Sequence, residues 1–392
     1  MNKRIQKLKI LCIVGARPNF VKIAPLIAEM KKYPNFIQPV LLHTGQHYDQ
    51  AMSKELFRDL KIPKPDIYLY VGSGPHAKQT AEIMNRVDDV IIRERPNLIL
   101  VVGDVNSTLA CALVGAKLQI PVAHVEAGLR SFNSAMPEEI NRTLTDRLSD
   151  LLFITEQAAN KNLLKEGLSK KKIFFVGNVM IDSLKKHLPR AKKSKIIKKL
   201  KLKPRKYILL TLHRAEIVDN KENLIRIFNI LKLIGQKSLI VWPVHPRTKD
   251  RIREVDLGNE LKLLSNLIIT DALGYLDFLS LEYNARAVLT DSGGVQEETT
   301  FLGVPCITLR QETERPSTVT MGTNAITGLN EQKIFKELNF ILTNRFKKGK
   351  IPPLWDGAAA QRIVKVILKK YIKFFRFTRS FVKENHSVAY KK

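Results

Sequence analysis

Short apolar runs alternate with longer amphipathic stretches along most of the chain. The runs have the length of buried strands, and the stretches between them repeat apolar residues at helical spacing. This alternation predicts βαβ units with parallel strands. In the first half, strands are expected at Lys9–Val14, Pro39–His43, Ile67–Val71, Leu98–Val102, Val122–Val125, Leu151–Ile154 and Ile173–Val176. In the second half, they are expected at Tyr207–Leu212, Leu239–Trp242, Leu267–Ile269, Ala287–Thr290 and Cys306–Leu309.

The alternation pauses once, between Leu188 and Lys206, where the chain is basic and bounded by prolines. Because 392 residues also exceed what one core usually fills, we expect two doubly wound, Rossmann-like α/β domains that face a central cleft. The expected units are a first domain at 1–180, a second at 181–355, a closing helix at 356–375 that packs back on the first domain, and a basic tail at 376–392.

The net charge of +29 raises the question of an anionic partner. Residues 185–206 hold twelve Lys or Arg and no acid, and the chain from Lys365 onward holds nine against Glu384 alone. The charge is therefore concentrated in a linker and a tail. No nucleic-acid-binding motif accompanies it, so we expect no nucleic-acid partner. The tail mixes aromatic residues with cations, which leaves open weak contact with an anionic membrane, although a solvated tail is the favoured interpretation.

The three cysteines, Cys12, Cys111 and Cys306, are far apart and lie in apolar or small-residue contexts. Buried thiols are therefore expected, rather than a disulfide framework or a zinc site. The apolar run that follows the charged N-terminal residues is too short for a signal peptide or a transmembrane segment. We expect a soluble cytoplasmic protein without a bound metal.

The most informative segment runs from His124 to Arg142, directly after one predicted strand. Residues that follow the carboxyl end of a parallel strand face the ligand crevice of such a sheet, so charged side chains here are candidates for a reacting site. Alternatively, Pro137 and the acids after it could simply begin a helix that carries an ordinary ion pair. The charged members of the segment are Glu126, Arg130, Glu138, Glu139 and Arg142.

Other strand ends in the first half carry further candidates. Arg17 and Lys22 follow Gly15 at the start of a predicted helix, which suits an anion site, but the GxGxxG pattern of dinucleotide binding is lacking. Asp104 follows the fourth strand as a catalytic or capping residue. The polar loop that contains His43, Gln46 and His47 is interpreted as binding or loop structure, not as a metal site.

In the second half, His213 and Arg214 end the first strand, and His245 and Arg247 repeat the arrangement after the next. Cations at such positions suit a departing phosphate. A further junction combines small residues that let a backbone approach a diphosphate with Glu298, which can accept hydrogen bonds from a ribose diol. This junction comprises Ser292, Gly293 and Gly294, and Arg315 follows nearby.

Eight blocks occur in order along the chain: GARPNFVK, TGQHYD, GD at Gly103 and Asp104, HVEAGLRS, PEEINR, TLHR, DSGGVQEE and ETERP. Together they resemble the non-hydrolysing UDP-N-acetylglucosamine 2-epimerase family over nearly the whole chain. The resemblance implies two Rossmann-like domains in the glycosyltransferase B arrangement, a homodimer, a UDP-sugar substrate and no nicotinamide cofactor.

The same resemblance implies roles for individual residues. It implies catalytic roles for Asp104, Glu126, Glu138, Arg142 and His213, and substrate contacts from Arg17, Lys22, Ser292, Gly293, Gly294, Glu298 and Arg315. The reaction it implies is reversible C2 epimerisation of UDP-N-acetylglucosamine to UDP-N-acetylmannosamine. Alternatives are a related UDP-acetamido sugar, such as a diacetamido-uronic acid or a deoxysugar, a hydrolysing epimerase and a glycosyltransferase of the same fold.

Inversion at C2 explains why several acids would surround one sugar. The C2 hydrogen has no neighbouring carbonyl group to acidify it, so the C1–O bond must weaken first, and loss of UDP and the proton gives a glycal-like alkene. Cations and a helix N-terminus stabilise the departing diphosphate, and two sugar faces need two acid/base groups. We expect Asp104, Glu126 and Glu138 to divide these roles, Arg142 to orient a carboxylate and His213 to assist the diphosphate.

Overall fold

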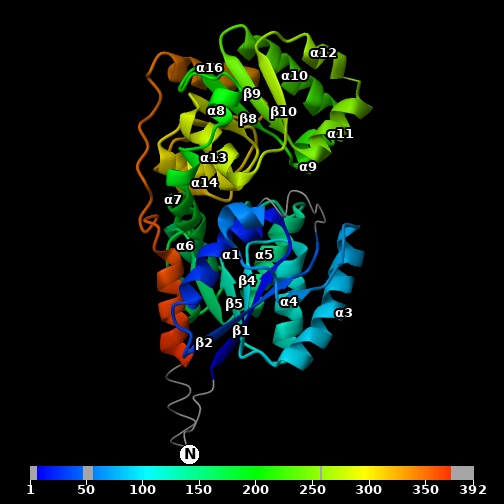
Figure 1. The fold of residues 1–392 in the computed structure, drawn as a ribbon, viewed down its shortest axis with the longest axis vertical. Helices are drawn as coiled ribbons and strands as arrows, with labels where there is room; N and C mark the ends of the chain where they lie inside the picture. The colour runs from blue at the N-terminus through cyan, green and yellow to red at the C-terminus, as the bar shows by residue number, and fades with distance from the viewer. Residues whose placement is uncertain (1–6, 47–55, 257, 372–392) are drawn as a thin grey trace, which may run out of the picture.

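The computed structural model describes residues 7–46, 56–256 and 258–371, which form two lobes stacked along the long axis of the molecule (Figure 1). Each lobe is built around one sheet in which all strand pairs are parallel. The α/β class expected from the alternating pattern is therefore confirmed. Among the described residues, no helix combines the length and apolarity needed to cross a bilayer.

The first sheet has seven strands in the order β3-β2-β1-β4-β5-β6-β7. Its strands are β1 (Leu8–Val14), β2 (Ile37–His43), β3 (Ile67–Tyr68), β4 (Leu98–Val102), β5 (Val122–Val125), β6 (Leu151–Ile154) and β7 (Ile173–Phe175). The helices of this half are α1 (Arg17–Met30), α3 (His76–Glu94), α4 (Asn106–Lys117), α5 (Pro137–Leu148), α6 (Gln157–Lys165), α7 (Val179–Ala191) and α8 (Ile196–Lys199), with a short 3₁₀ helix, η1, at Lys170–Lys172.

Both faces of this sheet are covered, which explains why its strands are apolar at successive positions. In β1, alternate side chains enter two different cores. Leu8, Ile10, Cys12 and Val14 join a core with α1 and α7, whereas Leu11 and Ile13 join one with α3 and α4. Cys12, Cys111 and Cys306 are all buried free thiols, as expected.

The second sheet has six strands in the order β10-β9-β8-β11-β12-β13. Its strands are β8 (Tyr207–Thr211), β9 (Leu239–Val244), β10 (Leu267–Asp271), β11 (Ala287–Thr290), β12 (Cys306–Thr308) and β13 (Asn324–Ile326). Its helices are α9 (Ala215–Val218), α10 (Lys221–Gly235), α11 (Pro246–Glu254), α12 (Gly258–Lys262), α13 (Tyr275–Asn284), α14 (Gly293–Leu302), α15 (Pro316–Thr320) and α16 (Glu331–Leu342).

Two strands differ from the sequence prediction by more than a shift of one or two residues at an end. β13 was not predicted, because its three residues include Asn324 and form no apolar run. The predicted strand Ile67–Val71 ends at Tyr68, because Tyr70 adopts a left-handed backbone with φ of 55°, which an extended strand does not accommodate.

A helix at 359–371 returns to the first lobe, where Ala359, Ala360, Ile363, Val364 and Ile367 pack against the core of α1 and α7 (Figure 1). Tyr275 and Leu279 of α13 enter the same core, so one apolar cluster joins elements of both halves of the chain. The predicted continuation of the closing helix to residue 375 and the basic tail lie outside the described residues.

Asp182 on α7 fixes the start of the closing helix. Its two carboxylate oxygens accept hydrogen bonds from the backbone N–H groups of Ala359 (3.1 Å) and Ala360 (2.8 Å). These N–H groups have no partner within their own helix, so a side-chain acceptor stabilises the helix end. The indole of Trp355 adds a second anchor by donating to the Thr155 carbonyl at 3.0 Å.

Replacing Asp182 with Ala should therefore loosen this helix. Loss of such a cap costs about 1–2 kcal/mol, so we expect the amides of residues 359–371 to exchange about 5- to 30-fold faster in hydrogen–deuterium exchange mass spectrometry. Asp89→Ala, on the exposed side of α3, is the control. Unchanged exchange in residues 359–371 of Asp182→Ala would contradict the assignment.

Candidate active site

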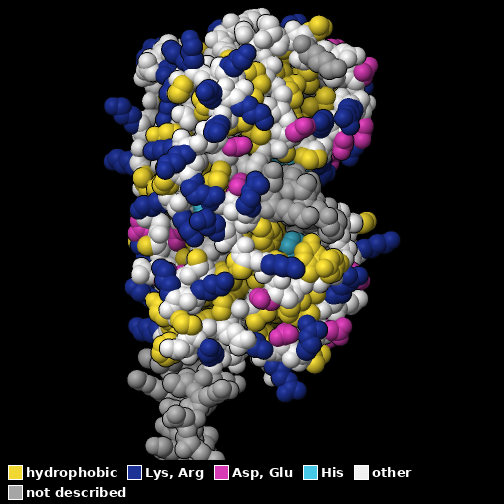
Figure 2. Space-filling model, in the orientation of Figure 1, with side chains coloured by type: hydrophobic (Ala, Val, Ile, Leu, Met, Phe, Trp, Pro, Cys, Tyr) yellow, Lys and Arg dark blue, Asp and Glu magenta, His cyan; other side chains and the backbone are white. Residues whose placement is uncertain are grey.

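The first strand of each sheet along the chain creates a switch point, where chain connections leave in opposite directions. In the first sheet β1 lies between β2 and β4, and in the second β8 lies between β9 and β11. Ligands bind outside the carboxyl ends of strands at such points. The surface is hollowed at the boundary between the two lobes, on the right of the view in Figure 2.

Residues from both lobes meet directly at this boundary. Arg17 donates to the carbonyl of Leu273 at 3.0 Å, and the Asn133 amide donates to Glu312 at 3.0 Å. Two of the acids predicted from the sequence, Glu126 and Glu138, also form ion pairs with arginines of the opposite lobe, which are described below. The switch points of the two sheets therefore face each other.

Glu126 lies at the centre of the boundary, directly after β5. Its backbone has φ of 78°, and its N–H and that of Ala127 both donate to the carbonyl of Phe153, at 3.0 and 3.1 Å. One carboxylate oxygen pairs with Lys22 of α1, and the other accepts from Arg315 Nη2 at 2.7 Å. A left-handed non-glycine residue costs about 1–2 kcal/mol and is concentrated at functional sites.

Gly103 permits this close packing. Its own φ is 71°, and a Cβ atom at this position would lie 3.3 Å from Lys22 Nζ and 3.5 Å from Glu126 Oε2. The left-handed backbone therefore favours glycine here, and a larger residue would crowd Lys22 Nζ.

Asp104 and Arg142 form a second ion pair beside Glu126. Arg142 of α5 also contacts Glu139 Oε2 through Nη1 at 2.7 Å. Burial alone would raise the pKa of Asp104, but the charges of Arg142 and Lys22 lower it to about 2. Asp104 is therefore an anion at neutral pH.

The neighbouring acids Glu138 and Glu139 have different environments. Glu139 is nearly buried and accepts hydrogen bonds from the backbone N–H groups of Ser131 (2.9 Å) and Phe132 (3.0 Å), so it holds the loop before α5. Glu138 is 37% exposed and lies 3.5 Å from Arg214 of the opposite lobe. Of this pair, Glu138 is the one that a ligand can reach.

Arg130, which the sequence grouped with these acids, lies in a structural network instead. Its guanidinium donates twice to Glu166, both at 2.7 Å, and pairs with Asp146 at 2.8 Å. Asp146 in turn contacts His124 Nδ1 at 2.7 Å. Of the charged candidates in this segment, Arg130 and Glu139 therefore stabilise loops in this structure.

On the second lobe, Asp291 organises the end of β8. Its buried carboxylate accepts from the backbone N–H groups of His213 (2.8 Å) and Arg214 (2.7 Å) and lies 3.2 Å from His213 Nδ1. Burial would raise the pKa of Asp291, but the His213 charge and these hydrogen bonds lower it overall. His213 remains 37% exposed, with its ring 5.7 Å from that of His245.

The N-terminus of α14 lies against Arg315. A Cβ atom at Gly293 would sit 3.0 Å from Arg315 Nη1, so glycine is needed for the guanidinium to pass across the helix end. Ser292 is the N-cap residue and its side chain makes no cap hydrogen bond. Free N–H groups at a helix start bind anions, and Gly294 completes this small-residue turn.

Arg315 links several carboxylates. Besides Glu126, it pairs with Glu297 through Nε at 2.9 Å and with Glu314 through Nη1 at 3.7 Å. Glu314 also lies 3.6 Å from both Arg142 and Arg214. Burial opposes ionisation of Glu314, but the surrounding arginines lower its pKa far below the usual range. Glu297 and Glu314 were not among the predicted site residues, although both lie within the quoted blocks QEE and ETERP.

Glu298 is buried behind Arg315 and the carboxylates that pair with it, among other buried polar groups. It accepts from the Tyr275 hydroxyl at 2.9 Å, and its charge interacts with the buried carboxyl group of Glu282 of α13. Burial raises the pKa of Glu298 to about 7 and also holds the pKa of Glu282 well above its usual value. Glu282 is thus buried as a neutral carboxylic acid close to Glu298. No sequence signal identified Glu282, because it sits within an otherwise ordinary helical stretch.

The loop after β2 has a structural role. The His43 ring lies between Phe20 and Tyr68, with ring centroids 5.0 and 4.4 Å away, and burial lowers the pKa of His43 to about 4. Gln46 accepts from the Ser107 N–H at 3.0 Å and hydroxyl at 2.7 Å. His47 lies outside the described residues. Within the described chain, no group of His, Cys, Asp or Glu has the arrangement of a metal site.

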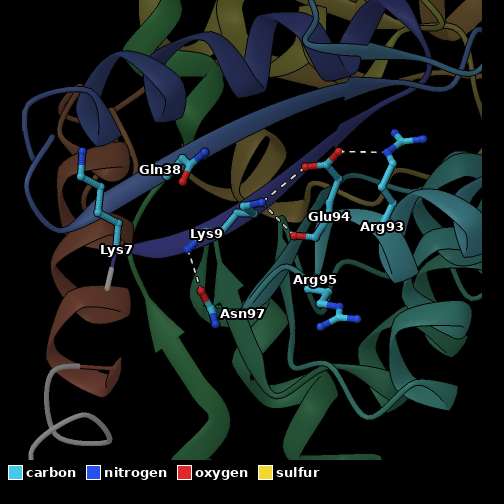
Figure 3. Close-up of a pocket in the computed structure, with 7 residues that line it drawn as sticks. All are labelled: Lys7, Lys9, Gln38, Arg93, Glu94, Arg95 and Asn97. Atoms are coloured by element: carbon cyan, nitrogen blue, oxygen red, sulfur yellow. Dashed lines mark hydrogen bonds and ion pairs between the residues drawn. The ribbon is translucent and has the colours of Figure 1, made fainter. Parts of the chain in front are cut away.

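A different hollow, of about 420 Å³, lies at the amino ends of strands in the first sheet, opposite the carboxyl ends that face the lobe boundary (Figure 3). Lys9 donates there to the Glu94 carbonyl at 2.8 Å, and Asn97 accepts from the Lys9 N–H at 2.8 Å. Because it adjoins the amino ends of β1 and β4, it does not belong to the candidate active site. Its lining residues are Lys7, Lys9, Gln38, Arg93, Glu94, Arg95 and Asn97.

The structure therefore places the predicted residues in three positions. Asp104, Glu126, Glu138, Arg142, Lys22 and Arg315 converge at the lobe boundary. His213, Ser292, Gly293 and Gly294 lie at the strand ends and helix start that face them. Arg17 bridges the lobes, and Glu298 is held one layer deeper.

A family model described as UDP-N-acetylglucosamine 2-epimerase matches residues 28–368. The chain belongs to this family. The UDP-N-acetylglucosamine 2-epimerase of Methanocaldococcus jannaschii is 43% identical over 367 residues, which cover 92% of this chain and 99% of the relative. A crystal structure of the M. jannaschii UDP-GlcNAc 2-epimerase in complex with UDP-GlcNAc and UDP superposes with a TM-score of 0.86, at 44% identity, and covers 92% of this chain and 99% of that one.

The family also includes a relative with another named substrate. The UDP-2,3-diacetamido-2,3-dideoxy-D-glucuronate 2-epimerase of Pseudomonas aeruginosa is 40% identical over 370 residues, covering 92% of this chain and all of the relative. The likeness to the 2-epimerase structures confirms the predicted family and the glycosyltransferase B arrangement of two Rossmann-like domains.

The Glu282 and Glu298 pair predicts how stability of this 2-epimerase family member depends on pH. Folded-state pKa values above the usual 4.5 mean that the folded protein retains protons that the unfolded chain releases, so stability falls as pH rises from 4.5 through about 7. Glu282→Gln keeps the size of the side chain but cannot ionise. Its thermal midpoint should therefore decline less between pH 5 and pH 8 than that of the wild type.

A matched control completes this test. Glu222→Gln, at the exposed start of α10, should follow the wild-type curve. A Glu282→Gln curve parallel to the wild type would show that Glu282 does not hold a proton in the folded state.

Proposed function

We propose that this chain catalyses reversible C2 epimerisation of UDP-N-acetylglucosamine to UDP-N-acetylmannosamine. The observation that carries the proposal is the position of Glu126, whose carboxylate is held by Lys22 of one lobe and Arg315 of the other, beside Asp104. A sugar placed here would have acids around its ring and the start of α14 beside its diphosphate.

The ion pairs suggest how substrate would prepare the site. A diphosphate at the N-terminus of α14 would compete with Glu126 for Arg315, because phosphate and carboxylate oxygens accept from the same guanidinium. Glu126 would then lose one of its two ion-pair partners and be released toward the sugar as substrate binds. The site would thereby couple nucleotide binding to activation of the acid beside the sugar.

The proposed reaction proceeds by elimination and re-addition. The C1–O bond breaks, UDP takes the electron pair, and a carboxylate takes the proton from C2 as the C1–C2 double bond forms. Protonation of C2 from the opposite face and re-addition of the UDP oxygen at C1 give the epimer. Positive charge that develops at C1 is stabilised by the carboxylates, and the departing diphosphate by Arg315 and the helix end.

Each residue has a role that its surroundings permit. Glu126 and Glu138 can act as the base and acid on the two faces, and the low pKa of Asp104 suits it to stabilise the cationic carbon. Arg142 holds Asp104 in place, and His213 assists the diphosphate from the end of β8. The homodimer remains a prediction, which light scattering of the purified chain would test.

Proton NMR of UDP-N-acetylglucosamine incubated with the enzyme in D₂O tests the reaction. We expect the C2 epimer to accumulate with deuterium at C2, because the proton passes through a group that exchanges with solvent. No acceptor is added, so a glycosyltransferase would leave the sugar nucleotide unchanged, and a hydrolysing epimerase would release free sugar and UDP. Turnover of the diacetamido-uronate nucleotide alone would assign the chain to the activity named for the P. aeruginosa relative.

Glu126→Gln tests the central residue. The substitution keeps the size of the side chain but removes the base, so kcat should fall by about 100- to 10,000-fold. UDP affinity measured by calorimetry should be retained or increase, because Arg315 and α14 remain and Glu126 no longer competes for Arg315. Glu222→Gln serves as the control. Wild-type turnover in Glu126→Gln would remove this residue from the mechanism.

A further inference from the structure

The segment between the two lobes carries a dense positive charge that the reaction does not use. We define the basic strap as residues 185–206, which contain twelve Lys or Arg and no Asp or Glu. Eleven of these cations are exposed, and Arg190 is half-buried. The strap runs from the second half of α7 through α8 to the start of β8 (Figure 1).

The contacts of the strap cations are mostly with neutral groups. Lys185 donates to the Asp356 carbonyl at 2.9 Å, and Arg205 donates to the Ala285 carbonyl at 2.9 Å. Lys192 lies over the ring of Tyr283, 4.5 Å from its centroid. These contacts fix the strap without neutralising it, so its cations repel one another and attract anions.

Two further cationic segments lie on the same side of the molecule. The connection to the closing helix contains Arg345, Lys347, Lys348 and Lys350, and the closing helix exposes Lys365, Lys369 and Lys370. Asp356 lies between these two segments, and its carbonyl accepts a hydrogen bond from Lys185 of the strap. Figure 1 shows the connection beside α7 and the closing helix below it, on the same left side of the view. We call residues 185–206, 345–350 and 365–370 together the basic flank.

The basic flank lies away from the mouth of the cleft. α7 packs against α1 of the first lobe and α13 and α14 of the second, so it closes the cleft on this side. The hollow between the lobes opens on the other side of the view in Figure 2. A partner could therefore cover the flank while substrate enters and leaves.

We propose that the basic flank docks on an anionic phospholipid bilayer. The charge is spread over three segments that span both lobes, which suits a broad plane of headgroups, and clusters of Lys and Arg bind such surfaces. The sequence continues from Tyr371 to Lys383 with Phe and Arg or Lys closely interleaved, a composition typical of interfacial segments. A second copy of the chain would bring like charge to the flank and is disfavoured.

Vesicle co-sedimentation of the full chain tests the proposal. We expect binding to phosphatidylcholine vesicles that contain phosphatidylglycerol, no binding to pure phosphatidylcholine, and release at about 1 M salt, where charges are screened. The triple variant Lys198→Glu, Lys199→Glu and Lys201→Glu should bind the anionic vesicles at least about tenfold more weakly, because each cation near the surface contributes about fivefold.

A matched variant distinguishes the effect of charge in the strap from the effect of net charge on vesicle binding. Arg226→Glu, Lys232→Glu and Lys237→Glu change the net charge equally, but they lie on or just after α10, away from α7 (Figure 1). We expect this variant to keep near wild-type vesicle binding. Equal loss in both triple variants, equal binding to uncharged vesicles, or no vesicle binding by the wild type would overturn the proposal. The proposal would also be overturned if the wild type bound duplex DNA or RNA but not vesicles, and the strap variant abolished that nucleic-acid binding.

Discussion

One carboxylate connects the two lobes of this protein. Glu126 is nearly buried, has a left-handed backbone, and pairs with Lys22 on its own lobe and with Arg315 on the other. A buried anion is stable only where cations and donors replace water. The relative position of the lobes therefore depends on charges that are also the proposed chemical groups, so binding at the site and closure of the cleft are physically linked.

Buried carboxylates at the lobe boundary and behind it fall into two electrostatic classes. Asp104 and Glu314 lie beside arginines, and those charges hold their pKa values low despite burial. Glu282 and Glu298 lie among weaker counter-charges, and burial raises their pKa values. The neighbouring charges therefore decide which buried carboxyl groups are anions at neutral pH and which retain a proton.

The sequence revealed the fold because its strands are buried on both faces and are therefore continuous apolar runs. The prediction failed for strands that are not continuous apolar runs or that end within one. β13 is too short and polar to form an apolar run, and the left-handed backbone of Tyr70 ends β3 before the apolar run does. The sequence also indicated that the segment from His124 to Arg142 lies at the cleft, since strand order brings carboxyl ends together. The residue pattern alone did not separate Glu138 from Glu139, and only the family resemblance singled out Glu138, because one helical step decides which side chain enters the loop and which faces Arg214.

Residues such as Arg130 and Glu282 show a further limit. Their functions depend on partners distant in the sequence, Glu166 for the first and Glu298 for the second, which no local pattern specifies. Blocks shared with a family identify the members of a site. They do not reveal the surrounding side chains that hold the site residues in position.

The most direct measurement is a crystal structure of Glu126→Gln with UDP-N-acetylglucosamine bound. We expect the diphosphate at the N-terminus of α14 beside Arg315, and the hexose between the lobes with C1 or C2 within about 3.5 Å of side-chain atoms of residue 126, Asp104 or Glu138. A sugar ring bound outside the lobe boundary, beyond the reach of all three side chains, would show that these acids do not carry the reaction.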